Sequence, residues 1–243
     1  NVLISVTLLS KLDKNNKIDP QKALVKIKNK KKLSKNSYKS ILLQLKKWIL
    51  KLKPKEEKTV WDSYSKLNTY KNNEQETKLK LINEFSKKYK PNLLADVGCN
   101  DGVYSFESIN AGAKKVVGFD IDINSLNRAY LISKKKNLNF LPIYLDAMNP
   151  SANLGWNENE RLSFNKRMNF DCMIALAFEH HLALANNVPL NETVNWLVSI
   201  APYGLIEFVE KEDETVKRML SLKGDIFPNY NMNNFEKNIL LKC

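Results

Sequence analysis

The stretch that most constrains the fold is residues 93–105, where an apolar run breaks into a tight glycine turn. Residues 93–97 are typical of a buried parallel strand, and residues 103–110 can continue as a helix. The chain has only seven glycines, and four of them lie between Gly98 and Gly118, where the backbone must turn sharply or approach a neighbour closely. A strand, a glycine turn and a helix in this order open a doubly wound nucleotide-binding domain.

The side chains of the turn argue against a dinucleotide. A pyrophosphate site uses the pattern G-x-G-x-x-G, in which bare amides face the anion. Here Asp96 and Asp101 flank the turn, and Asn100 stands where a middle glycine is usual. Asn tolerates the left-handed backbone better than other residues with a side chain. The two carboxylates repel an anion and favour a cationic ligand that carries an amino group and a sulfonium.

Acidic residues also follow two further predicted strands. Asp120 ends the strand at 115–119 and lies 22 residues beyond Gly98, where an acid reaches ribose hydroxyls in nucleotide folds. Asp122 is the alternative, or it caps the helix that follows. Asp146 closes the next strand. Because parallel strands end at one edge of a sheet, we expect the acids at 96, 120 and 146 to meet there.

The pattern Asp-x-Gly-x-Asn-x-Gly resembles motif I of class I S-adenosylmethionine (SAM)-dependent methyltransferases. From about residue 61 to residue 236 the chain is similar to a bacterial group related to nodulation-type and surface-glycan methyltransferases. The matching pieces are residues 96–102, 177–182, 187–190, 206–209 and 225–228. The resemblance implies SAM as cofactor, an adenine contact from Asp146, and methyl transfer to oxygen or nitrogen. It does not supply the acceptor.

The expected architecture is α/β, with a doubly wound, mostly parallel, Rossmann-like sheet over residues 59–243 after a Lys-rich helical extension over residues 1–58. A helix over 74–89 is expected to pack across the cofactor end of the sheet. Residues 235–243 offer at most one strand of the hairpin that closes the sheet in the resembling family, so we expect truncation or disorder there. The chain begins at Asn1 and not Met, so we expect a processed product or part of a larger polypeptide or complex.

The expected cofactor site includes the residues that directly follow the strand ends. The set is Asp96, Gly98, Asn100, Gly102, Asp120, Ile121, Asp146, Ala147 and Leu176. Trp61, Tyr64 and Tyr70 precede the domain's first helix and are expected either to cover the cofactor or to fill the core.

His180 and His181 are the only histidines of the chain, and they follow the strand predicted at 170–175. In this fold the methyl-acceptor pocket lies there, and a hydroxyl acceptor needs a base with a pKa near neutral. Neighbouring residues point different ways, so we expect one histidine to be the base, with His181 preferred and Glu179 as the alternative. The other interpretations are a metal site formed by these three residues and a purely structural pair. We expect no metal.

The net charge of +13 is uneven along the chain. Residues 1–90 hold 24 lysines and eight acidic residues, whereas residues 91–243 hold 15 basic and 18 acidic residues. Such asymmetry is typical of a surface for nucleic acid or anionic membrane, although enrichment in Lys and Asn can be compositional. Helices are expected over about 20–32 and 38–52, the second basic and amphipathic. We expect weak, salt-sensitive RNA binding through this extension.

Three cysteines do not form a disulfide framework, and no apolar run reaches the length that crosses a bilayer. We therefore expect a cytoplasmic protein. The preferred function is a methyltransferase acting on a small-molecule or glycan acceptor. Its rivals are an RNA methyltransferase that uses the basic extension and a catalytically idle SAM-binding domain of a larger assembly. A continuous lysine surface leading into the pocket would favour RNA, whereas acidic pocket residues favour a small or neutral acceptor.

Overall fold

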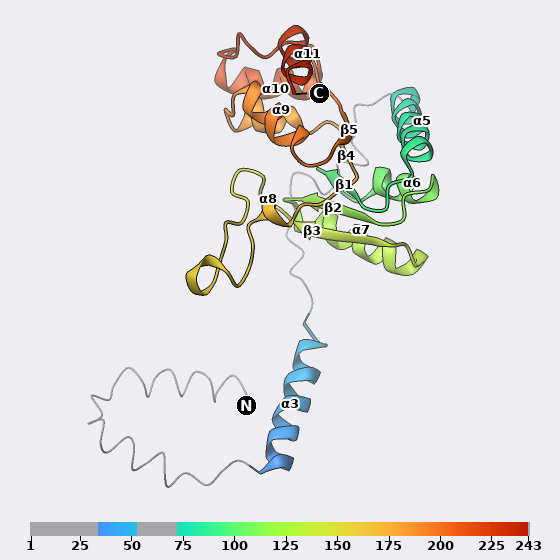
Figure 1. Cartoon of the computed structure of the whole chain (residues 1–243), viewed down its shortest axis with the longest axis vertical. Helices are drawn as coiled ribbons and strands as arrows, with labels where there is room; N and C mark the ends of the chain where they lie inside the picture. Colours follow the sequence, from blue (N-terminus) through green and yellow to red (C-terminus); the bar gives the residue numbers. More distant parts are fainter. Residues whose placement is uncertain (1–33, 53–71, 243) are drawn as a thin grey trace, which may run out of the picture. The chain divides into compact units, whose positions relative to one another are not determined.

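The computed structural model describes residues 34–52 and 72–242 (Figure 1). The chain divides into two units, Asn1–Glu56 and Glu57–Cys243, and each is described by itself. The helix expected over 20–32 lies outside the described residues, as do Trp61, Tyr64 and Tyr70.

The second unit is built on a parallel sheet of five strands in the order β3-β2-β1-β4-β5. The strands are β1 (Leu94–Val97), β2 (Val116–Asp120), β3 (Phe140–Tyr144), β4 (Cys172–Ala175) and β5 (Tyr203–Ile206). The expected doubly wound, Rossmann-like α/β fold is confirmed. The strand order reverses between β1 and β4, and ligands bind outside the carboxyl ends of the strands at such a switch point.

Helices alternate with these strands along the chain (Figure 1). The helices of the second unit are α5 (Asn72–Tyr89), α6 (Val103–Asn110), α7 (Ile123–Lys136), α8 (Phe164–Arg167), α9 (Leu190–Val198), α10 (Glu214–Lys223) and α11 (Met232–Leu240), with short turns η1 (Trp156–Glu158) and η2 (His181–Ala185). In the first unit the structure describes α3 (Lys35–Ile49).

The central strand β1 is buried on both faces because its side chains alternate between two apolar layers. Leu94 packs in a cluster with Ile82 of α5 and Leu126 of α7. Its neighbour Ala95 packs in a second cluster with Leu197 of α9. This alternation is the reason that the strand reads as an apolar run in the sequence, interrupted only by the buried Asp96.

The C-terminal segment departs from the expected strand. Residues 232–240 form the helix α11, whose N-cap Asn231 accepts a hydrogen bond from the amide of Asn234 at 2.9 Å. Phe235 is buried in a third apolar cluster with Val209 and Tyr230. Residues 235–242 thus supply no strand of the closing hairpin, of which at most one was expected here, because Phe235 and Ile239 are spaced for a helix face and not for a strand.

No helix among residues 34–52 and 72–242 combines the length and the apolar character required to cross a membrane.

Candidate active site

A cavity of about 440 Å³ lies at the carboxyl edge of the sheet. Six segments form its walls: the turn after β1, the start of α6, the ends of β2 and β3, the segment after β4, and the helix α5. The side chains on these walls that matter for chemistry are Gln75, Lys78, Asn100, Asp101, Asp120, Asp146 and His181. The volume lies in the range of small-molecule and cofactor sites.

The glycine turn is held by the neighbouring strand. The amides of Gly98 and Cys99 donate to the carbonyl of Phe119 at 2.8 and 3.0 Å. Gly98 has φ 81° and Asn100 has φ 46°, so both adopt the left-handed region expected from the sequence. A Cβ at Gly98 would lie 2.7 Å from Phe178 Cδ2, so glycine also allows the chain after β4 to approach the turn closely.

Asp120 is aligned by two backbone donors. Its Oδ2 accepts from the amide of Asn100 and its Oδ1 from the amide of Asp122, both at 2.8 Å. Burial raises the pKa of Asp120, and these two amide contacts oppose the rise by stabilising the charged form. Each carboxylate oxygen keeps a second lone pair. The carboxylate is thus fixed on the cavity wall with acceptor capacity remaining.

Asp96 lies beneath the cavity and not on its wall. The carboxyl is buried and its Oδ2 accepts from Ser105 Oγ at 2.5 Å. Burial raises the pKa of Asp96 to about 7, the Ser105 hydrogen bond lowers it, and repulsion from Asp120 adds to the rise. The same field acts on the buried thiol of Cys99, whose pKa is raised first by burial and then by both carboxylates. This uncompensated negative field is suited to a cationic ligand.

Most of the other expected cofactor residues line the cavity, and Gly102 does not. Asp146 lines the cavity, and its Oδ1 accepts from the amide of Met148 at 2.9 Å. Further lining residues from the expected set are Gly98, Ile121, Ala147 and Leu176. Gly102, at φ 85°, stands at the start of α6 and not among the lining residues. Asp122 caps α7 by accepting from the amides of Asn124 and Ser125.

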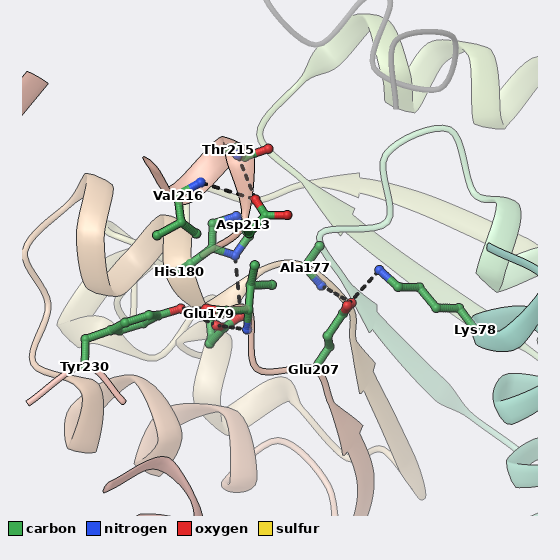
Figure 2. A network of polar contacts seen from close by, with 10 residues as sticks. Lys78, Ala177, Glu179, His180, Glu207, Asp213, Thr215, Val216 and Tyr230 are labelled. Atoms are coloured by element: carbon green, nitrogen blue, oxygen red, sulfur yellow. Dashed lines mark hydrogen bonds and ion pairs between the residues drawn. The ribbon is translucent and has the colours of Figure 1, made fainter. Parts of the chain in front are cut away.

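Of the three candidate catalytic residues, only His181 lines the cavity. His181 lines the cavity as the first residue of η2, whereas His180 is buried and its ring lies 4.1 Å from that of His181. Glu179 is fully buried behind the cavity wall. Its Oε1 accepts from the amide of Val209 at 2.9 Å and from the hydroxyl of Tyr230 at 2.7 Å (Figure 2).

The electrostatics of His181 differ from those expected of a general base. Burial, and then repulsion from His180, lowers the pKa of His181 to about 3. The expectation of a near-neutral pKa is therefore corrected, because the imidazole is removed from water and has a second histidine as its neighbour. His181 is a neutral hydrogen-bonding group throughout the physiological range of pH.

Sequence reasoning expected the helix over 74–89 at the cofactor end of the sheet but missed Gln75 and Lys78 as lining residues of the cavity. Lys78 pairs with Glu207 at 2.7 Å, and Glu207 in turn accepts from the amide of Ala177 at 2.9 Å (Figure 2). Ala177 has φ 49°, an unusual conformation for a residue with a Cβ. The expected position of the helix over 74–89 was the signal available, but the residues facing the cavity, Gln75 and Lys78, are polar and do not stand out in a lysine-rich segment.

Among the described residues, no group of three His, Cys, Asp or Glu side chains gathers in a way that could hold a metal ion.

Comparison with known proteins gives one extensive relative. The chain is 47% identical over 201 residues to the nodulation protein NoeA of Rhizobium meliloti (strain 1021), a match that covers 82% of this chain and 42% of NoeA. It is 32% identical over 98 residues to the tRNA U34 carboxymethyltransferase of Campylobacter lari (strain RM2100 / D67 / ATCC BAA-1060). This match covers 39% of this chain and 30% of that enzyme. The chain thus spans less than half the length of these relatives. No family model matches the chain.

Comparison with solved structures finds similarities at low sequence identity and low TM-score. A ribosomal protein L11 methylase from Lactobacillus delbrueckii subsp. bulgaricus is 18% identical, with a TM-score of 0.36 and coverage of 63% of this chain and 69% of that chain. The [4+2]-cyclase SpnF is 14% identical, with a TM-score of 0.44 and coverage of 67% of this chain and 54% of SpnF. Similarities at this level say nothing about the reaction.

Proposed function

We propose that this chain is a class I SAM-dependent methyltransferase, which binds SAM in the cavity at the carboxyl edge of its sheet and methylates a hydroxyl of a small molecule or glycan. The observation that carries the proposal is the acidic cavity itself, in which a left-handed glycine turn and two strand-end carboxylates meet around one neutral histidine.

The cavity fits SAM by its charge. SAM carries a sulfonium and an ammonium, and it supplies an electrophilic methyl group. Asp101, Asp120 and Asp146 line the cavity, and the repulsion that Asp96 and Asp120 exert on each other is relieved by a cation. A pyrophosphate would increase that repulsion. We assign Asp120 to the ribose hydroxyls and Asp146 to the adenine amino group, because carboxylates accept from both.

The carboxylate of the amino-acid part needs a different partner. Of the described residues that line the cavity, Lys78 alone carries a permanent positive charge. Its ion pair with Glu207 holds the ammonium group at the cavity wall. We assign Lys78 to the carboxylate end of SAM, where it balances a charge that the acidic turn would otherwise repel.

The cavity wall also bears on the acceptor. A polyanionic acceptor such as RNA would meet three carboxylates and one lysine that is already paired. A neutral polyhydroxy acceptor meets no such repulsion. Methyl transfer is an in-line displacement governed mainly by positioning. Neutral His181 is suited to accept a hydrogen bond from the acceptor hydroxyl, to fix its direction and to receive its proton.

The experiment is a methyl-transfer assay with the whole chain and methyl-labelled SAM. Panels of neutral oligosaccharides and of small hydroxylated molecules are offered beside tRNA, and labelled product and S-adenosylhomocysteine are measured together. We expect label in a neutral hydroxylated acceptor. Absence of transfer to every acceptor, with SAM bound, would leave the idle cofactor-binding domain as the better description.

RNA methylation is the second candidate, because the shorter relative is named for a reaction on tRNA and because residues 1–90 are strongly basic. Label recovered in tRNA, and not in neutral acceptors, would favour this candidate over the first.

A further inference from the structure

The helix α3 of the first unit carries exposed apolar side chains. It begins after the N-cap Ser34, which accepts from the amide of Ser37 at 3.1 Å, and it contains no buried residue. On α3 and the residues just after it, eight large apolar side chains are between 43% and 74% exposed: Tyr38, Ile41, Leu42, Leu43, Trp48, Ile49, Leu50 and Leu52. Exposed apolar surface of this extent generally marks an interaction site.

All of these side chains except Leu43 and Leu50 lie in one continuous stripe, which Leu45 completes. At about 100° per residue, Tyr38, Ile41, Leu42, Leu45, Trp48, Ile49 and Leu52 fall within an arc of roughly 120°. Serine, asparagine, glutamine and lysine occupy the remaining circumference together with Leu43 and Leu50. The helix is therefore amphipathic, and its apolar face is broad enough to lie on a surface along its whole length.

The charge of the helix has a single sign. Residues 34–52 contain five lysines and no acidic residue, and the absence of acids extends from residue 20 to residue 55. Lys35, Lys39 and Lys46 border one edge of the apolar arc, and Lys47 and Lys51 lie on the opposite face. A helix that packs on a protein core usually balances its lysines with acidic residues, whereas this one complements only an anionic surface.

Two anionic partners match the lysines, and the apolar arc distinguishes them. RNA neutralises lysines and stacks on aromatic rings, but it gives no reason to expose the aliphatic Ile41, Leu42 and Ile49. A bilayer with anionic headgroups accepts aliphatic side chains among its acyl chains, aromatic rings at its interface and lysines at its headgroups. We propose that α3 is an interfacial helix that lies on the surface of an anionic lipid bilayer.

The direct test is flotation of the whole chain with vesicles of phosphatidylcholine containing about one third phosphatidylserine, and with vesicles of phosphatidylcholine alone. We expect binding to the anionic vesicles only. Trp48→Glu should reduce the bound fraction at least about tenfold, because it places a charge in the apolar face. The matched control is Trp156→Glu, since Trp156 is 86% exposed and lies in another unit of the chain. It should bind as the unaltered chain does.

A second pair of variants tests the lysines. Lys39→Gln with Lys46→Gln should weaken vesicle binding by on the order of tenfold. The control, Lys134→Gln with Lys135→Gln, removes the same charge from the end of α7 and should have little effect. Raising the salt concentration should weaken binding without abolishing it, because apolar burial is not screened.

Three outcomes would overturn the proposal. The first is no binding to anionic vesicles. The second is binding that Trp48→Glu leaves intact and salt abolishes, particularly if RNA competes for it, which would assign the lysines to nucleic acid. The third is a lowered unfolding temperature in Trp48→Glu with unchanged vesicle binding, which would mean that the stripe packs on the chain itself.

Discussion

At the residue scale, the cavity wall and the layer beneath it hold side chains whose ionisation is displaced in opposite directions. Burial holds Asp96 near the point of half-protonation at neutral pH, with a pKa of about 7, and holds His181 neutral, with a pKa of about 3. Both shifts have desolvation as their largest cause, and both reduce the charge carried into the protein interior.

The two histidines should respond differently to substitution. His181→Ala should leave SAM affinity nearly unchanged and lower turnover by about 10²-fold, the lower end of the range for general bases, because burial weakens its basicity. The pH–rate profile should show no acidic limb near pH 6.5. His180→Ala, the matched control, should change stability more than turnover. Equal turnover in both variants would mean that neither imidazole meets the acceptor.

The raised pKa of Asp96 makes the stability of the chain depend on pH. The pKa of this carboxyl is about 7 in the folded chain and has its ordinary value of 3.8 in the unfolded chain, so the folded chain binds more protons than the unfolded chain between these pH values. The free energy of unfolding should therefore fall as pH rises from about 4 to about 7, by on the order of 1.4 kcal/mol for each pKa unit. Asp96→Asn should lose this component. Denaturant titrations giving parallel pH curves for both proteins would contradict it.

Lys78 can be tested with a pair of ligands. Lys78→Met should weaken SAM binding about tenfold, roughly 1.4 kcal/mol, and leave decarboxylated SAM nearly unaffected. Lys80→Met on an exposed position of α5 is the control. An equal loss for both ligands would instead indicate that the Lys78–Glu207 pair acts on the shape of the wall.

At the element scale, the segment after β4 is tied to later parts of the chain by two carboxylates. Glu207, just beyond β5, holds the amide of Ala177, and Glu179 joins Val209 to Tyr230 (Figure 2). These contacts join β5 and the loop before α11 to the wall that carries His181. The left-handed Ala177 and the π-helical turn η2 are kept in place by contacts more than 20 residues away in sequence.

Tyr230 provides a stability test of that connection. Its buried hydroxyl shares one proton between Glu179 Oε1 and the carbonyl of Val209, at 2.7 and 2.5 Å. Tyr230→Phe should lower the free energy of unfolding by about 1–3 kcal/mol, because buried acceptors lose their donor. Tyr203→Phe is the control, since Tyr203 is 53% exposed. Similar midpoints of thermal unfolding for both variants would show that the network contributes little.

Elements with a strong local signal could be predicted from the sequence. The glycine turn, the strand ends that carry Asp120 and Asp146, and the helix at 103–110 depend on neighbours in the chain, and the structure has them where expected. The helix α11 could not be predicted because the family's closing hairpin outweighed the helical spacing of Phe235 and Ile239. The burial that sets the pKa of His181 depends on tertiary packing, which local patterns do not contain.

At the scale of the whole molecule, charge is segregated along the chain. The lysine excess lies in residues 1–90, whereas residues 91–243, which supply most of the cavity wall, carry a slight acidic excess. This distribution favours a cationic cofactor at the cavity. An anionic partner that binds the lysines of α3 would therefore say nothing about the charge of the methyl acceptor.

Calorimetric titration of SAM and of NAD into the whole chain, into Asp120→Ala and into Asp122→Asn decides most directly whether the cavity is a SAM site. SAM should bind the unaltered chain and NAD should not, because NAD brings a pyrophosphate to an acidic turn. Asp120→Ala should weaken SAM binding by about 1.5–3 kcal/mol. Asp122→Asn, which keeps a competent helix cap, should not weaken it. Tighter binding of NAD than of SAM, or equal SAM affinity in all three proteins, would contradict the assignment.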